Sequence, residues 1–316
     1  MKIKFLAATA TIALLSSAAH ADGEKIAVFT KNQTNPLFAS IRAGADAAAR
    51  QMNATTQQYV PTKPDNIPEQ MSEIEDVIVK KPDAIVFIPV DSKAMVAGVE
   101  KINAANIPVV NINDHAAGGK FVSFVGGNDY ELGLETARYL LKNLGGKGNV
   151  VIIEGVRAAS TNQNRLKGFM KALEENPNVK LLTKQTGNYQ RNQALQVMEN
   201  LMETYPKIDG VLSANDAMAT GIIEALAGAH RQALVIGVNG TGIAEIKEGK
   251  LLATGDYAGF QQGCLGVMIA IRNLRKLPVP DEILFPPTLI TKDNVQAYDI
   301  ADDKRACPKW EDVVKK

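Results

Sequence analysis

The sequence predicts an α/β protein built from two doubly wound lobes. Short apolar runs rich in β-branched residues alternate with helical patterns along most of the chain. The strand-like runs are apolar at every position rather than at every second one, and the alternation occurs in two consecutive series. Continuous apolar strands separated by helices are typical of parallel sheets that are covered by helices on both faces.

The first series extends to residue 112, and its runs KIAVFT, AIVFIP and IPVVNI are the clearest strands. Strands are predicted at residues 25–30, 56–59, 84–89 and 107–112. Helices are predicted at residues 36–52 and 92–104, with a third between them that opens at Pro64 and Asp65. In the first helix Leu37, Ile41 and Ala45 recur at helical spacing and indicate one buried face.

The second series begins near Asn128 and repeats the same alternation. Helices are predicted at residues 130–144, 161–174, 192–205, 217–229 and 242–248, and strands at residues 149–153, 179–186, 210–213 and 233–238. A short apolar run at 251–254 precedes a long helical pattern at 259–277, which Pro278 and Pro280 end. The tail at 292–316 is polar and shows no clear core stripe.

The first 21 residues have the pattern of a cleaved secretory signal peptide. Lys2 and Lys4 precede an apolar run at residues 5–15, and Ala19-His20-Ala21 forms a small-x-small cleavage site. The run is shorter than the roughly 20 residues that a membrane-spanning helix needs, and no cysteine near the cleavage site suggests a lipid anchor. We therefore expect the mature protein to begin at Asp22 and to work outside the cytoplasm, which excludes most cytosolic enzymes and DNA-binding regulators.

The composition is that of an ordinary globular protein, with 46% hydrophobic and 22% charged residues. Lys and Arg total 35 against 34 Asp and Glu, so the chain lacks the basic excess of a nucleic-acid-binding protein. Beyond the signal, His115 and His230 share no ligand spacing with each other or with the cysteines, which predicts no metal site. Cys264 and Cys307 either form a disulfide in an oxidising compartment or remain as separate thiols.

Polar side chains follow nearly every predicted strand, and ligands of doubly wound sheets bind at the carboxyl ends of the strands. These residues are Lys31, Asn32, Asn35, Asp91, Asn113, Asp114, His115, residues 157–161, Tyr189, Asn215, Asp216, Asn239 and Thr241. The set offers amides, cations and an aromatic face but no organised nucleophile, which favours binding over catalysis. Asn35, before Pro36, and Asn215 also suit the N-caps of the following helices, and both roles stay open for them.

Seven segments in order resemble periplasmic sugar-binding proteins of the ribose type. They are KIAVFTKNQTNPLFASIRAGADAAA, IEDVIVKKPDAIVFIPVDS, IPVVNIND, FVGGNDYELG, NRLKGF, SANDAMATG and VIGVNGTG, and the resemblance covers residues 25 to about 287. It implies a type I periplasmic binding protein with two Rossmann-like lobes joined by three hinge crossings, near residues 126–128, 256–258 and 286–289. The expected first lobe is 22–126 plus 258–287, and the second is 127–257 plus the tail 288–316.

The resemblance also implies which residues bind the ligand. Asn35 and Phe38 match the amide and one stacking aromatic of the family's first loop. Arg165, Tyr189 and Asn215 match a retained arginine, a stacking aromatic and an amide.

Other positions depart from the ribose binders. Asn113 and Asn239 stand where the family commonly has Asp, Asp114 and Gln163 where ribose binders have Arg, Lys31 where they have a small polar residue, Leu37 where they have a second aromatic and Tyr257 where they have a hinge Gln. Fewer aromatic faces and relocated carboxylates suit a polyol or an unusual furanose at least as well as ribose.

We therefore expect a monomeric periplasmic component of an ABC importer that binds a small sugar or polyol by closure of its lobes and presents it to a membrane permease. The resemblance implies no catalytic residue and no cofactor, and it allows a chemoreceptor as a second partner. One alternative is a binder of a furanosyl signal of the autoinducer type. Another is an exported sugar-acting enzyme, for which Asp91, Asp114 and Asp216 are the candidate carboxylates.

Overall fold

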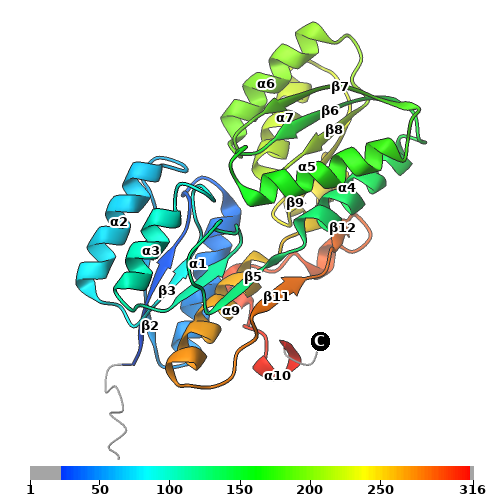
Figure 1. The fold of residues 1–316 in the computed structure, drawn as a ribbon. Coiled ribbons are helices and arrows are strands. Elements are labelled where there is room, and N and C mark those ends of the chain that lie inside the picture. The colour runs from blue at the N-terminus through cyan, green and yellow to red at the C-terminus, as the bar shows by residue number, and fades with distance from the viewer. Residues whose placement is uncertain (1–22, 314–316) are drawn as a thin grey trace, which may run out of the picture.

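The computed structural model describes residues 23–313, so the predicted signal peptide lies outside the described residues. The chain forms two lobes, each with its own six-stranded sheet between helices (Figure 1). We call the lobe with strands β1 to β5 and β11 the first lobe, and the lobe with β6 to β10 and β12 the second; their bounds follow.

The first lobe follows the predicted alternation closely. Its elements are β1 (Lys25–Phe29), α1 (Pro36–Gln51), β2 (Thr55–Tyr59), α2 (Ile67–Lys80), β3 (Ala84–Phe87), α3 (Val96–Ala104), β4 (Val109–Ile112) and β5 (Ser123–Gly127), joined late in the chain by α9 (Gly259–Leu274) and β11 (Glu282–Phe285). Helix α2 begins at Ile67 rather than at Pro64 and Asp65, because the side chain of Asn66 caps it by accepting from the N–H of Glu69. Strands β5 and β11 were not predicted, and two of the five residues of β5 are glycine, which is depleted in strands.

The second lobe also matches the predicted order, apart from β12, which was not predicted. It contains α4 (Asp129–Asn143), β6 (Gly148–Glu154), α5 (Ser160–Glu174), β7 (Val179–Thr186), α6 (Arg191–Thr204), β8 (Gly210–Ser213), α7 (Asp216–Gly228), β9 (Leu234–Asn239), α8 (Ile243–Lys247), β10 (Ala253–Asp256) and β12 (Leu289–Thr291). A polar tail follows, with η1 (Val295–Ala297), η2 (Asp302–Lys304) and α10 (Trp310–Val313).

The strand orders confirm two doubly wound lobes. The first sheet has the order β11-β5-β4-β3-β1-β2 and the second β12-β10-β9-β8-β6-β7. All neighbours in the first sheet are parallel, and in the second only β12 runs antiparallel, beside β10. The chain passes between the lobes three times, from β5 to α4, from β10 to α9 and from β11 to β12.

Helix α9 returns to the first lobe because it packs closely against α1 and against β3 and β4. The two helices approach so closely that a Cβ atom at Gly263 would lie 1.9 Å from the carbonyl oxygen of Ile41. A Cβ at Gly44 would likewise lie 2.0 Å from the carbonyl oxygen of Phe260. Glycine at these two positions therefore permits the contact that attaches a late segment of the chain to the first lobe.

The tail contacts both lobes. Asp299, just after η1, pairs with Lys247 of α8 in the second lobe, whereas the last part of the tail is fastened to the first lobe, although the sequence grouped it with the second. Cys307 forms a disulfide with the fully buried Cys264 of α9, with 5.6 Å between their Cα atoms. The guanidinium of Arg272 lies 4.2 Å from the ring centre of Trp310 in α10. The remaining bounds of the expected division into domains stay a prediction.

Replacing Cys307 by Ser is expected to lower the free energy of unfolding by about 2–4 kcal/mol. The disulfide closes a loop with a sequence separation of 43, which restricts the unfolded chain. Urea unfolding of the variant and of the wild type, each with and without reductant, measures the effect. The reductant should destabilise only the wild type. Equal stability of the wild type and the variant without reductant would contradict a stabilising role for the disulfide.

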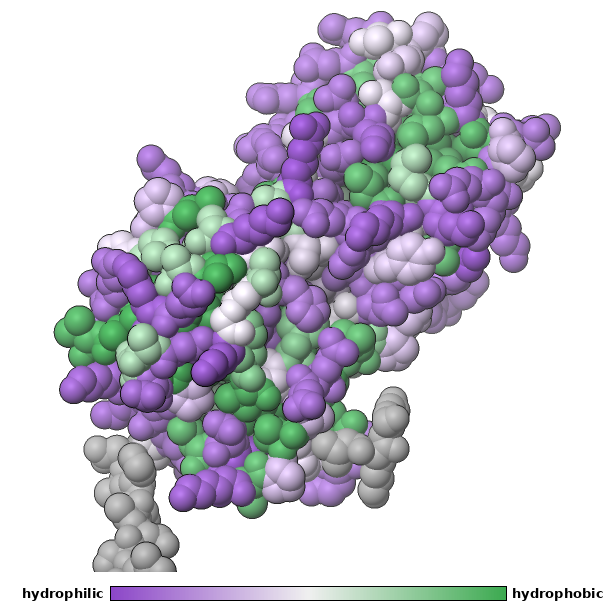
Figure 2. All heavy atoms as spheres, in the orientation of Figure 1, coloured by the Kyte–Doolittle hydropathy of each residue, from purple (hydrophilic) through white to green (hydrophobic). Residues whose placement is uncertain are grey.

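The surface carries no continuous apolar band on the face that Figure 2 shows, where hydrophobic side chains gather in separate patches among hydrophilic ones. Within residues 23–313 no helix is both long and apolar enough to cross a membrane. The same part of the chain contains no group of three or more His, Cys, Asp or Glu side chains that could hold a metal ion.

Candidate functional site

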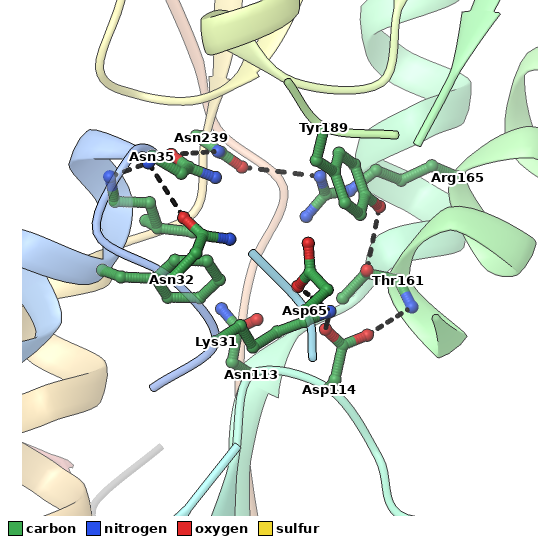
Figure 3. Close-up of a pocket in the computed structure, with 12 residues that line it drawn as sticks. Lys31, Asn32, Asn35, Asp65, Asn113, Asp114, Thr161, Arg165, Tyr189 and Asn239 are labelled. Atoms are coloured by element: carbon green, nitrogen blue, oxygen red, sulfur yellow. Dashed lines mark hydrogen bonds and ion pairs between the residues drawn. The ribbon is translucent and has the colours of Figure 1, made fainter. Parts of the chain in front are cut away.

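A polar cavity lies between the lobes, where loops at the carboxyl ends of strands from both sheets meet. Its volume is about 20 Å³, little more than one water molecule needs, so the two lobes lie closed on one another in this structure. The first lobe contributes Lys31, Asn32, Asn35, Leu37, Phe38, Asp65, Asn113 and Asp114, and the second contributes Thr161, Arg165, Tyr189 and Asn239. Figure 3 shows the polar members of this set around a common space.

Lys31 and two carboxylates form an ion cluster on the first lobe's side of the cavity. Lys31 is only 1% exposed, and its Nζ lies 3.0 Å from Asp114 Oδ2 and 3.7 Å from Asp65 Oδ1. Burial alone disfavours the charged amine, but the charges of Asp114 and Asp65 raise the pKa of Lys31 above its usual value. The pKa of Asp65 is raised, because burial outweighs the opposing effect of Lys31.

Asp114 reaches across the cavity to the N-terminus of α5 in the second lobe. Its Oδ1 accepts hydrogen bonds from the backbone N–H of Thr161 at 3.0 Å and from the hydroxyl of Ser160 at 3.2 Å. The N-cap residue of α5 is Ala159, whose side chain makes no capping bond. Asp114 thus acts as the cap of a helix in the other lobe. Burial opposes its ionisation, but the charge of Lys31 and the N–H of Thr161 hold the pKa of Asp114 below its usual value.

Arg165 anchors the other side of the cavity. Its Nε donates to Asp129 Oδ1 at 2.8 Å, and its Nη1 donates to the carbonyl of Ala214 at 2.8 Å and to Asn239 Oδ1 at 3.4 Å. The guanidinium also lies 4.4 Å from the ring centre of Tyr257. Burial raises the pKa of Asp129 to about 6, although the charge of Arg165 opposes that rise.

Tyr257 links this network to the first lobe from beneath the cavity. Its hydroxyl donates to Asp129 Oδ2 at 2.8 Å and lies 3.2 Å from the backbone oxygen of Asn113, which it can also reach as a donor. The side-chain amide of Asn113 in turn donates to Gln262 Oε1 at 3.3 Å. The middle crossing of the chain is therefore tied to both lobes by buried polar contacts.

Amides and two aromatic rings complete the cavity. Asn35 caps α1 by accepting from the N–H of Leu37 at 3.1 Å, and the same Oδ1 accepts from Asn239 Nδ2 of the second lobe at 3.5 Å. Phe38 and Tyr189 come from opposite lobes, and the Tyr189 hydroxyl lies 2.9 Å from Thr161 Oγ1. The cavity thus combines directional donors and acceptors with apolar ring faces, the combination that suits a small hydroxylated molecule.

The structure brings most of the predicted site residues to this cavity: Lys31, Asn35, Phe38, Asn113, Asp114, Arg165, Tyr189 and Asn239. Their roles in binding stay a prediction. Asn35 proves to be both a helix cap and a cavity residue, the pair of roles left open by the sequence.

Three predicted residues lie elsewhere. Gln163 is exposed and donates to the backbone oxygen of Arg157. Thr161 and Arg165 are four positions apart and therefore lie on the same face of α5, the one that faces the cavity, whereas Gln163 lies on the opposite face. Asn215 uses both ends of its amide, accepting from the N–H of Met218 and donating to the backbone oxygen of Tyr189. Tyr257 is fully buried below the cavity.

Sequence reasoning missed Asp65 as a cavity residue. Asp65 follows β2 and was assigned to the start of the next helix, but it precedes the cap of α2 and adopts a left-handed backbone with φ of 54°. The rule that polar residues after a strand face the ligand edge would have found it, because the loop after β2 lies at that edge. Asn32 and Thr161 satisfied the same rule and line the cavity as the rule predicts.

Two doubly wound lobes that enclose a polar cavity at their strand ends define a two-lobed solute-binding protein. A family model described as a periplasmic binding protein domain matches residues 26–277, and the chain belongs to this family of type I periplasmic sugar-binding proteins.

Similar proteins agree with that placement. The chain is 33% identical over 222 residues to the ribose import binding protein of Bacillus subtilis, covering 70% of this chain and 72% of that protein. It is 28% identical to the xylitol-binding protein of Mycolicibacterium smegmatis, over 88% of this chain and 80% of that one. A solved periplasmic solute-binding protein of Actinobacillus succinogenes with bound D-allose superposes with a TM-score of 0.82 at 31% identity, covering 87% of this chain and all of that one.

Proposed function

We propose that this protein is the periplasmic solute-binding component of an ABC importer and that it carries a small sugar or polyol. The observation that carries the proposal is the cavity between the lobes, which both lobes line with amides, charged groups and one aromatic ring each. Hydroxyl groups both donate and accept, so they match amides and carboxylates in fixed directions. The relatives include a ribose import binding protein and a xylitol-binding protein, a sugar and a polyol binder.

Binding in this proposal works by closure of the lobes. The solute first meets the loops of one lobe, and closure then brings up the other, so that Phe38 and Tyr189 face its apolar surfaces from opposite sides. Contacts such as the one between Asp114 and the N–H of Thr161 form only when the lobes meet. The closed form, with the solute enclosed, is the form presented to the permease.

Catalysis is not part of the proposal, because the carboxylates of the enzyme alternative have structural tasks. Asp91 accepts from the backbone N–H groups of Lys93 and Ala94, both at 2.8 Å, and so caps the turn before α3. Asp216 accepts from the hydroxyl of Thr254 and from the N–H of Gly242 inside the second lobe. Asp114 alone of the three lines the cavity, and its two oxygens already accept from Lys31, Thr161 and Ser160.

Location and partner follow from the same proposal. Membership of a periplasmic binding protein family and the signal-like N-terminus both support export to the periplasm. The partner is the membrane permease of the importer, and the carrier acts as a monomer without a cofactor.

Thermal unfolding of residues 22–316 against pentoses, hexoses, tetritols, pentitols, inositols and furanosyl signals tests the proposal. A solute present at about 1,000 times its dissociation constant stabilises the native state by roughly 4 kcal/mol, a shift of several degrees. We expect one sugar or polyol to give this shift and to be recovered chemically unchanged. Stabilisation by a furanosyl signal alone would favour the signalling alternative, and conversion of the solute would favour an enzyme.

A further inference from the structure

The charged groups of the cavity are not equally available to a solute. Arg165 is paired with Asp129, and Lys31 with Asp114, at 2.8 and 3.0 Å. Both oxygens of Asp114 already accept hydrogen bonds, Oδ2 from Lys31 and Oδ1 from Thr161 and Ser160. Asp114 is therefore occupied in holding the lobes together and is poorly placed to accept a solute hydroxyl.

Asp65 is in a different position. Its Oδ1 is buried and accepts no hydrogen bond from the described residues, and its ion pair with Lys31 is long, at 3.7 Å. The carboxylate belongs to the cavity wall, and in Figure 3 it lies in the middle of the labelled side chains. A buried carboxylate oxygen without a hydrogen bond is costly, so a donor that reaches it is strongly favoured.

The charge balance points the same way. The cavity wall and its immediate support hold two cations, Lys31 and Arg165, and three carboxylates, Asp65, Asp114 and Asp129. Lys31 is shared, with Asp114 at 3.0 Å and Asp65 at 3.7 Å, so Asp65 is the carboxylate whose charge is least compensated. An acidic solute would add a second negative charge beside it, at a buried place where solvent screens charges weakly.

We propose that the carboxylate of Asp65 accepts a hydrogen bond from a hydroxyl group of the solute. Through its negative charge the same residue selects uncharged polyhydroxylated solutes over their acid forms. This inference deepens the proposed function and rests on it. It assigns the hydroxyl-accepting role to a residue in the loop after β2, and it assigns Asp114 to closure.

Calorimetric titration of wild type and Asp65→Asn with matched trios of aldose, alditol and aldonate, such as ribose, ribitol and ribonate, tests the assignment. The trios are built on the sugar or polyol that stabilises the wild type. We expect the wild type to bind the neutral forms at least 100-fold more tightly than the aldonate. Asp65→Asn should weaken neutral binding about 10- to 100-fold, the range for a lost hydrogen bond to a charged group, and should reduce the discrimination against the aldonate.

Asn is the appropriate replacement because it tolerates the left-handed backbone at residue 65, where φ is 54°. Asp76→Asn, on the exposed side of α2, removes the same charge outside the cavity and should leave both affinities unchanged. Unfolding midpoints of the solute-free variants check that the fold is kept. Unchanged neutral affinity in Asp65→Asn, or equal wild-type affinity for aldonate and aldose, would overturn the role of Asp65 alone. If no sugar or polyol stabilises the wild type in the thermal unfolding screen, no trio can be built and the proposed function itself is overturned.

Discussion

Asp114→Ala is expected to weaken solute binding about 100-fold while leaving each lobe folded. In the structure Asp114 of the first lobe caps α5 of the second, whose own N-cap residue is Ala159. An N-cap contributes roughly 0.5–2 kcal/mol and a hydrogen bond to a charged group roughly 1.5–3 kcal/mol. The loss of the contacts with α5 falls on the closed form alone, because Asp114 and α5 separate when the lobes open, whereas the loss of the ion pair with Lys31 destabilises the open and closed forms alike. A loss of about 3 kcal/mol of closure energy corresponds to roughly two powers of ten in affinity.

Calorimetry gives the affinity, and small-angle scattering of the solute-free protein reports how far the lobes have opened. Asp91→Ala is a matched control, since Asp91 also caps a helical turn but entirely within the first lobe, through the N–H groups of Lys93 and Ala94. It should lower stability without changing affinity. Wild-type affinity in Asp114→Ala would show that this carboxylate does not hold the lobes together.

Arg165→Met is expected to lower the free energy of unfolding by about 3–5 kcal/mol, the usual cost of removing one partner of a buried ion pair. Arg165 is 2% exposed and Asp129 7%, so the substitution leaves a buried carboxylate without its cation. The change also removes the hydrogen bonds to Ala214 and Asn239. For a protein of this size the midpoint of thermal unfolding should fall by roughly 10 °C.

The double variant Arg165→Met with Asp129→Asn separates the causes. If the stranded charge of Asp129 dominates the loss, the second substitution restores a large part of the stability, because an amide oxygen at that position would still accept from the hydroxyl of Tyr257. No recovery in the double variant would assign the loss to packing and to the other hydrogen bonds instead. A loss below about 1 kcal/mol in the single variant would contradict a stabilising role for the pair.

The fold could be predicted largely from local sequence. Buried parallel strands are apolar at every position, as AIVF of β3 is, and helices such as α1 show their buried face in the spacing of Leu37, Ile41 and Ala45. Strand β5 was missed because it contains paired glycines and its pairing comes from β4 and β11, which lie elsewhere in the chain. The sequence offered the disulfide between Cys264 and Cys307 as one of two alternatives, and the structure contains it. The contact of Arg272 with Trp310 was not predicted, because it joins side chains that are far apart in the sequence.

The α/β class, the order of the elements and the edge of the sheets where the site lies follow from the amino-acid sequence, because they depend on periodicity and on the position of each residue relative to its strand. Which polar groups remain available in the cavity follows only from how the two lobes meet. Asp114 and Asp65 look alike in sequence, each an aspartate in a loop after a strand. Closure places Asp114 against the N-terminus of α5, whereas no hydrogen-bond donor of the described residues reaches Asp65 Oδ1. A carboxylate's role depends on the donors around it, and for Asp114 Oδ1 those donors come from the other lobe.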